Sequence, residues 1–99
     1  MIAHNVVAIR HGAPRLSYHD AQEIARRAAA DRDGWTVLVD LEGTTETTTA
    51  ALARLVVLRR DLRKCGRELH LLGPCGKAKH LFDVCRLGEL LPQQPPANA

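Results

Sequence analysis

The stretch VDLEGTTETTTAAL, from Val39 to Leu52, passes from an apolar run through a polar loop into a helix-forming segment. The apolar run begins upstream at Trp35 and is nearly continuous, which is typical of a strand covered on both faces in a parallel sheet. Five of the six residues between Gly43 and Ala50 are threonine. The stretch therefore predicts a strand, a threonine-rich loop at its carboxyl end, and a helix. Loops at this end of parallel strands usually carry the functional groups.

The segment before Trp35 has the same organisation. NVVAIRHG, from Asn5 to Gly12, is a short apolar run ended by glycine and predicts a strand. A helix is expected to follow, with Ser17 or Asp20 as its cap and Gly34 as its end, because apolar residues recur there at helical spacing. The apolar positions are Ala21, Ile24, Ala25 and Ala28.

The segment after the loop continues the alternation. Leucine spacing predicts the longest helix over Thr48–Lys64, ended by Gly66. ELHLLG, from Glu68 to Gly73, predicts another buried strand, and KAKHLFDVCRLGELL, from Lys77 to Leu91, predicts a third helix. Alternating strands and helices indicate an α/β fold with mostly parallel pairing and right-handed crossovers.

Length and composition limit the class of protein. The chain has 99 residues, 45% of them hydrophobic, so we expect a single small domain over residues 1–92. Residues 93–99 belong to a proline-rich, uncharged end and are expected to be disordered. A net charge of +3 and an aromatic content of 3% argue against nucleic-acid binding.

Neither a membrane span nor a secretion signal is expected, because no apolar run approaches about 20 residues and the start lacks a signal-peptide pattern. We therefore expect a cytoplasmic protein without direct membrane insertion. Cys65, Cys75 and Cys85 are an odd set without a CxxC pair. This spacing predicts buried or half-buried free thiols and no metal site, and nothing in the sequence calls for a cofactor.

The triplet Arg10-His11-Gly12 follows the first apolar run and resembles the histidine phosphatase family. In that family the histidine, here His11, is the nucleophile that takes up a phosphoryl group. The family also needs a second histidine and arginine far along a larger domain. His70 and His80 lie in no matching motif. A solvated strand end is the plainer interpretation, and we expect no enzyme.

Two further segments have a chemical and a structural interpretation. GPCGK, from Gly73 to Lys77, is similar to part of a phosphate-binding loop, but its spacing departs from the P-loop pattern and favours a tight strand-to-helix turn. A weak anion site at that helix start is the alternative. RRDLRKCGR, from Arg59 to Arg67, places positive charge where it complements a helix dipole. An acidic partner surface is its alternative.

The run from Thr36 to Pro92 resembles a STAS domain, the fold of bacterial anti-sigma factor antagonists that is also appended to sulphate transporters. The resemblance rests on a strand ending in Asp40-Leu41, a helix ending in KCG, a strand ending in LLGP and the closing segment LFDVCRLGELLP. It implies a small mixed, mostly parallel sheet with helices packed on one side. It also implies a non-catalytic regulator of transcription whose partner is a kinase-type anti-sigma factor. A small STAS subunit of a membrane transport system is the alternative.

In that family the anti-sigma factor phosphorylates a serine or threonine at the start of the second long helix. The family motif Asp-Ser-Ser-Gly-Leu falls on Thr48–Leu52, and the acceptor position is Ala50, which has no side-chain oxygen. Either Thr49 or Thr48 is the acceptor in a shifted register, or the switch is lost and the domain binds constitutively. Plain helix caps are the structural interpretation of these threonines. The partner-binding residues that the resemblance implies are Glu46, Thr47, Thr48, Thr49 and Ala51.

The first strand of the family is expected to be missing here, since only Met1–His4 precede Asn5. The strand at Val6–Arg10 is therefore expected at a sheet edge. Exposed edges recruit further strands, so the sequence leaves a homodimer by edge pairing open.

Overall fold

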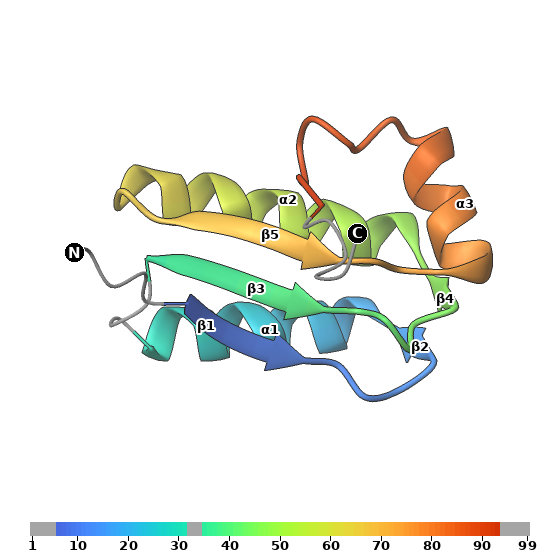
Figure 1. Cartoon of the computed structure of the whole chain (residues 1–99), viewed down its shortest axis with the longest axis horizontal. Helices are drawn as coiled ribbons and strands as arrows, with labels where there is room; N and C mark the ends of the chain where they lie inside the picture. Colours follow the sequence, from blue (N-terminus) through green and yellow to red (C-terminus); the bar gives the residue numbers. More distant parts are fainter. Residues whose placement is uncertain (1–5, 32–34, 94–99) are drawn as a thin grey trace.

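A computed structural model describes residues 6–31 and 35–93, and within these it contains five strands and three helices (Figure 1). The elements in chain order are β1 (Val6–Arg10), β2 (Arg15–Leu16), α1 (Tyr18–Ala30), β3 (Thr36–Asp40), β4 (Glu46–Thr47), α2 (Thr49–Lys64), β5 (Glu68–Leu72) and α3 (Gly76–Val84).

The main sheet has the order β1-β3-β5, and both pairings are parallel. β3 is the central strand, so Ala8, Leu38 and His70 form one row across the sheet. Among the described residues β1 pairs only with β3, as expected for an edge strand. The α/β fold with mostly parallel pairing is confirmed, and the short strands β2 and β4, which pair in parallel with each other, were not predicted.

Side chains of the main sheet alternate between a buried and a more exposed face. The first face contacts α1 and α2, which lie together on one side of the sheet (Figure 1). Its fully buried residues on β3 and β5 are Val37, Val39, Leu69 and Leu71. On the other face Ala8 is exposed and Leu38 is half-buried. The expectation that β3 is covered on both faces therefore holds for one face only, and the helices pack on one side as the resemblance implied.

The start of α1 follows from its capping residues. The hydroxyl of Ser17 accepts a hydrogen bond from the amide of Asp20 at 3.1 Å, and the Asp20 carboxylate accepts one from the amide of Ser17 at 2.9 Å. This is a capping box, which satisfies two amides that a helix start leaves free. The amide of Ser17 keeps the pKa of Asp20 below its ordinary value. The helix ends at Ala30, and its predicted terminator Gly34 lies outside the described residues.

The ends of α2 and α3 have the same geometry but different residues. In α2 the amides of Gly66 and Arg67 donate to the carbonyls of Arg63 and Leu62, and Gly66 has a φ of 78°. This is the Schellman motif, in which glycine adopts the left-handed conformation without strain. The predicted terminator of α2 is therefore confirmed.

In α3 the same bonds run from Arg86 and Leu87 to Asp83 and Phe82, and Arg86 itself has a φ of 55°. The third helix therefore ends at Val84 instead of continuing to Leu91 as predicted. The chain then turns back, which buries both Leu87 and Leu91.

The chain after α3 returns to the sheet. The amide of Leu71 donates to the carbonyl of Pro92 at 2.9 Å, and Leu71 forms an isolated bridge with Gln93. The described chain thus runs along the free edge of β5 as far as Gln93. Residues 94–99 of the predicted disordered tail lie outside the described residues.

Candidate functional site

Three connecting segments meet at the carboxyl end of the sheet, where β1, β3 and β5 point in the same direction (Figure 1). Backbone hydrogen bonds continue the strand pairing beyond the strands. The amide of His11 donates to the carbonyl of Asp40 at 3.0 Å, and that of Leu41 donates to Leu72 at 2.9 Å. The threonine-rich segment therefore lies between the connectors that follow β1 and β5, as its position after an inner strand predicted.

Most of the threonine hydroxyls in this segment donate hydrogen bonds to backbone carbonyls of the connector that follows β1. Those of Thr44, Thr45 and Thr47 donate to the carbonyls of Ala13, Pro14 and Leu16 at 3.5, 3.4 and 2.9 Å. Thr44 is fully buried. These three threonines, named here the threonine clamp, join the segment after β3 to the segment after β1. The need for several threonines, which capping alone leaves unexplained, follows from this clamp.

Backbone pairing reinforces the clamp. The amides of Thr45 and Glu46 both donate to the carbonyl of Pro14, at 2.8 and 3.0 Å, and β2 pairs with β4 immediately after it. Arg15 forms an exposed ion pair with Glu46 at 3.3 Å. An exposed pair of this kind contributes roughly 0–1 kcal/mol, so the buried and backbone contacts hold the two segments together.

The start of α3 is closed by the same loop. The amides of Cys75 and Ala78 donate to the carbonyls of Thr44 and Thr45 at 3.0 and 2.8 Å. Gly76 has a φ of 58°, and a Cβ there would lie 3.4 Å from the Cβ of Thr45. The predicted tight turn is confirmed. The amides of Cys75 and Ala78 are bonded to the protein and are therefore not available to an anion.

The residues that sequence reasoning assigned to partner binding divide into two groups. Of these residues Glu46, Thr48 and Thr49 are exposed, and Thr47 is half-buried. The exposed three, together with the exposed Ala50 at the aligned acceptor position, are named here the loop face. Ala51 is fully buried in the core, so its side chain offers nothing to a partner.

The two candidate acceptors differ in what their hydroxyls do. Thr48 caps α2, because its hydroxyl accepts a hydrogen bond from the amide of Ala51 at 3.1 Å. Thr49 occupies the first position of the helix, is exposed, and has no side-chain hydrogen bond within residues 6–31 and 35–93. Of the two exposed threonines of the loop face, Thr49 is therefore the one whose hydroxyl makes no hydrogen bond to the described chain.

His11 is held by the backbone. Its Nε2 lies 2.7 Å from the carbonyl oxygen of Arg15, which requires a proton on Nε2, and 3.9 Å from a carboxylate oxygen of Asp20. The His11 side chain is 13% exposed. Because Nε2 donates to a carbonyl, this nitrogen has no lone pair with which to attack a phosphate.

All three cysteines are free and exposed, so the expectation that they are buried or half-buried is wrong. The thiol of Cys75 lies 3.4 Å from the carbonyl of Thr44 and 3.5 Å from that of Glu42. Searches of the described residues find no group of three or more histidine, cysteine or acidic side chains that could hold a metal ion. They also find no helix long and apolar enough to cross a membrane.

Comparisons with known proteins identify the fold. No protein-family profile and no curated protein matches the chain. The unphosphorylated form of the anti-sigma factor antagonist SpoIIAA matches with a TM-score of 0.66 and 17% identity, over 99% of this chain and 86% of that chain. The phosphorylated form of SpoIIAA, a Bacillus cell fate determinant, matches with a TM-score of 0.66 and 17% identity, over 99% and 90%.

A second kind of protein shares the fold. The inward-facing murine solute carrier 26 family member A9 anion transporter matches with a TM-score of 0.69 and 15% identity. The match covers 90% of this chain and 15% of the transporter, so the chain is similar to one part of a much longer protein. These likenesses show that the chain has a STAS-like fold.

Proposed function

We propose that this STAS-like domain is a non-catalytic protein-binding regulator, and that the loop face at the start of α2 is its binding surface. The partner we infer is a kinase-type anti-sigma factor, which makes the protein a bacterial, cytoplasmic anti-sigma factor antagonist. Support comes from the fold shared with SpoIIAA, which is known in unphosphorylated and phosphorylated forms. Further support comes from Thr48 and Thr49 of the loop face, which lie outside the clamp and expose polar side chains at the end of the sheet.

The observation that carries the proposal is the free hydroxyl of Thr49. Three neighbouring threonines form the clamp and Thr48 caps the helix, whereas Thr49 is exposed at the first position of α2. A phosphate at a helix start is favoured by the helix dipole, and it adds about −1.5 to −2 charges to the surface. We therefore assign the acceptor role to Thr49, one residue before the usual position at Ala50.

The test uses the full chain as bait in its native host, with bound proteins identified by mass spectrometry. We expect a kinase-type anti-sigma factor to bind the unmodified protein, and Thr49→Asp to weaken this binding at least tenfold. Thr49→Val is the matched control and should bind as the unmodified protein does. Equal binding of Thr49→Asp would show that the surface is constitutive and the switch lost. Phosphate found on Thr48 instead of Thr49 would contradict the assigned acceptor.

A role beside a membrane transporter is the second candidate function, because the chain matches one part of an anion transporter with a TM-score of 0.69. In this case the same bait should recover transporter subunits and no kinase-type partner. That result would reject the anti-sigma role while leaving the fold unaffected.

We also propose that the β1 edge takes part in self-association. In the described chain β1 has one strand neighbour, and Val6 is 52% exposed. A free strand edge presents unpaired amides and carbonyls to a second copy. Light scattering should give a dimer mass that Val6→Lys reduces to that of a monomer. A monomer mass for the unmodified protein at about 100 μM, where contacts of low affinity begin to form, would end this part of the proposal.

A further inference from the structure

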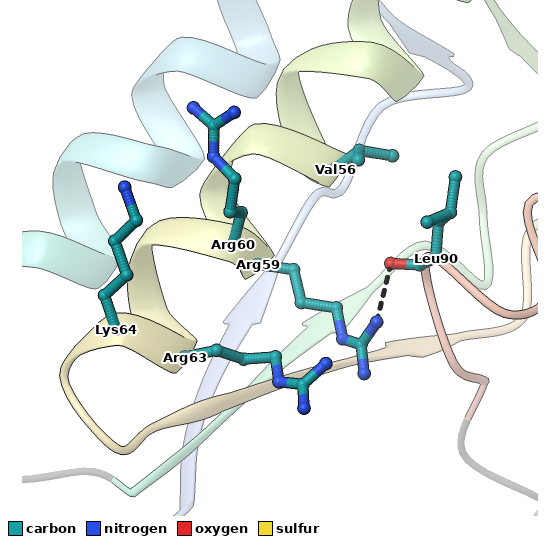
Figure 2. Close-up of a pocket in the computed structure, with 6 residues that line it drawn as sticks. All are labelled: Val56, Arg59, Arg60, Arg63, Lys64 and Leu90. Carbon is teal, nitrogen blue, oxygen red and sulfur yellow. Dashed lines mark hydrogen bonds between the residues drawn. The ribbon is translucent and has the colours of Figure 1, made fainter.

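The C-terminal half of α2 carries a shallow depression that faces the segment after α3 (Figure 2). Its volume is about 500 Å³, and we name it the basic groove. The lining residues are Val56, Arg59, Arg60, Arg63, Lys64 and Leu90. Four of these six side chains are cationic and none is acidic, so the groove presents positive charge to its occupant.

Arg59 builds one wall of the groove. Its guanidinium donates to the Glu68 carboxylate at 2.8 and 3.3 Å and to the carbonyl of Glu89 at 3.1 Å. It also donates to the carbonyl of Leu90 at 3.2 Å (Figure 2). The Arg59 side chain is 15% exposed. The Arg59 guanidinium is thus occupied by contacts within the protein, and these contacts hold the segment around Leu90 against the sheet and α2. The other cations of the groove are left for an occupant.

Arg60, Arg63 and Lys64 are those other cations, and all three are exposed. Arg60 lies 3.9 Å from Asp61, whereas Arg63 and Lys64 have no hydrogen bond or ion pair to a side chain in the part of the chain that is described. Lys79, by contrast, contacts both carboxylate oxygens of Asp83 at 2.8 Å. The helix dipole explains why cations are favoured in the last turn of α2. The Glu68 carboxylate has a pKa lowered mainly by the hydrogen bond from Arg59 and in part by the charge of Arg63, so it offsets some of the positive charge and an excess remains.

Apolar groups flank these charges. Val56 is half-buried at one side of the groove, and Leu90 is 49% exposed at the other. The groove has no aromatic side chain on which a nucleic-acid base could stack. Exposed cations beside a half-buried valine and an exposed leucine complement a chain segment that alternates acidic and apolar residues. We propose that the basic groove is a docking site for an acidic segment of a protein partner that also carries a leucine-type side chain.

This site is separate from the loop face. The two lie near opposite ends of a helix of 16 residues, which is about 24 Å long. The proposal goes beyond the function assigned to the loop face, and it can fail or succeed independently because different residues carry it.

The first experiment measures fluorescence anisotropy of a fluorescein-labelled peptide of 12 residues built from Glu and Leu. We expect binding at 50 mM salt that weakens as the salt concentration rises, because exposed charges are screened. Arg63→Gln with Lys64→Gln should reduce affinity about fivefold or more, as expected for the loss of two charge contacts. The matched control is Arg26→Gln with Arg27→Gln, which removes the same charge from the last turns of α1 and should change affinity less than twofold.

The apolar part of the proposal has its own pair of variants. Leu90→Ser should weaken binding about threefold, whereas Val84→Ser, at a 62% exposed position on α3, should not change it. Circular dichroism establishes that each variant is folded. Equal losses in the two double variants would mean that only net charge matters, and this would overturn the proposal. Tighter binding of a single-stranded oligonucleotide of equal charge at the same salt concentration would overturn it as well.

Discussion

The two ends of α2 differ in the chemistry of their polar side chains, which are hydroxyls at one end and cations at the other. At the N-terminal end the hydroxyls of Thr44, Thr45 and Thr47 donate to carbonyls of the neighbouring connector, and this leaves Thr49 exposed. At the C-terminal end Arg59 holds the shape, and the other cations face solvent. At each end some polar groups are consumed by the fold and others are left for a partner. The hydrogen-bond pattern, more than residue type, therefore distinguishes the polar groups that hold the fold together from those that a partner can contact.

The largest expected effect tests the threonine clamp. Replacing Thr44, Thr45 and Thr47 together by valine removes three hydrogen bonds at nearly constant volume, and each bond contributes about 1 kcal/mol. We expect the free energy of unfolding to fall by about 2–4 kcal/mol in urea denaturation. The control Thr49→Val should change it by less than about 0.5 kcal/mol. Similar losses for both would mean that Thr49 is as much a part of the fold as the clamp.

The second prediction concerns the turn that closes the basic end of α2. Gly66→Ala forces a residue with a Cβ into a φ of 78°, which should cost about 1–2 kcal/mol of unfolding free energy. Gly43→Ala is the control, since a Cβ there meets no atom within 4 Å and its φ is not in the left-handed range. Thermal denaturation of both variants makes the comparison. An unchanged midpoint for Gly66→Ala would show that this end of the helix is free to rearrange.

The third prediction compares a carboxylate near each end of the sheet as a function of pH. The hydrogen bond from Arg59 keeps the pKa of Glu68 below its ordinary value of 4.5, and the amide of Ser17 keeps that of Asp20 below 3.8. A lowered folded-state pKa gives stability that is complete above the ordinary value and is lost as pH falls through the folded-state value. The urea concentration at the midpoint of unfolding should therefore decrease as the pH is lowered below about 4.5. In Glu68→Gln this decrease should be smaller in the part of the range nearest pH 4.5.

The smallest expected effect concerns a cation in the middle of α2. The Nη1 atom of Arg54 is buried and has no hydrogen-bond partner. No other buried side-chain nitrogen or oxygen of the described residues lacks one. An unpaired buried donor is unfavourable. Arg54→Met keeps the apolar length and removes the donor, so the free energy of unfolding should stay within about 0.5 kcal/mol or rise. A loss above about 1 kcal/mol would show that Arg54 supports α2.

Local signals explain how much of this architecture could be predicted from the sequence. The strand in WTVLVDL, the Ser17 cap and the Gly66 terminator depend on neighbours in the chain, and all three are confirmed. Two of the features that the sequence did not predict have no such local signal. The end of α3 is formed by Arg86 in the left-handed conformation, and arginine is not a residue type from which such a turn is predicted. The clamp joins residues 31 positions apart, which no local pattern contains.

The position of the threonine-rich loop was predicted, but the contacts of its residues were not. Motif alignment put the loop at the end of an inner strand, where it lies. It could not show that Ala51 points into the core or that Thr48 is used as a cap, because burial depends on how α2 packs against the sheet. The role of Thr49 remains a prediction.

The central position of β3 also has a consequence for the folding pathway. Val6 pairs with Thr36, and Thr36 pairs with Glu68, so β1 and β5 never contact each other as strands. Each pairing must close a loop that contains one whole helix, and the entropic cost of loop closure changes slowly with loop length. The β1–β3 and β3–β5 pairings therefore have nearly equal entropic costs of loop closure, and both pairings include β3. No nucleus that contains a pair of main-sheet strands can form without it.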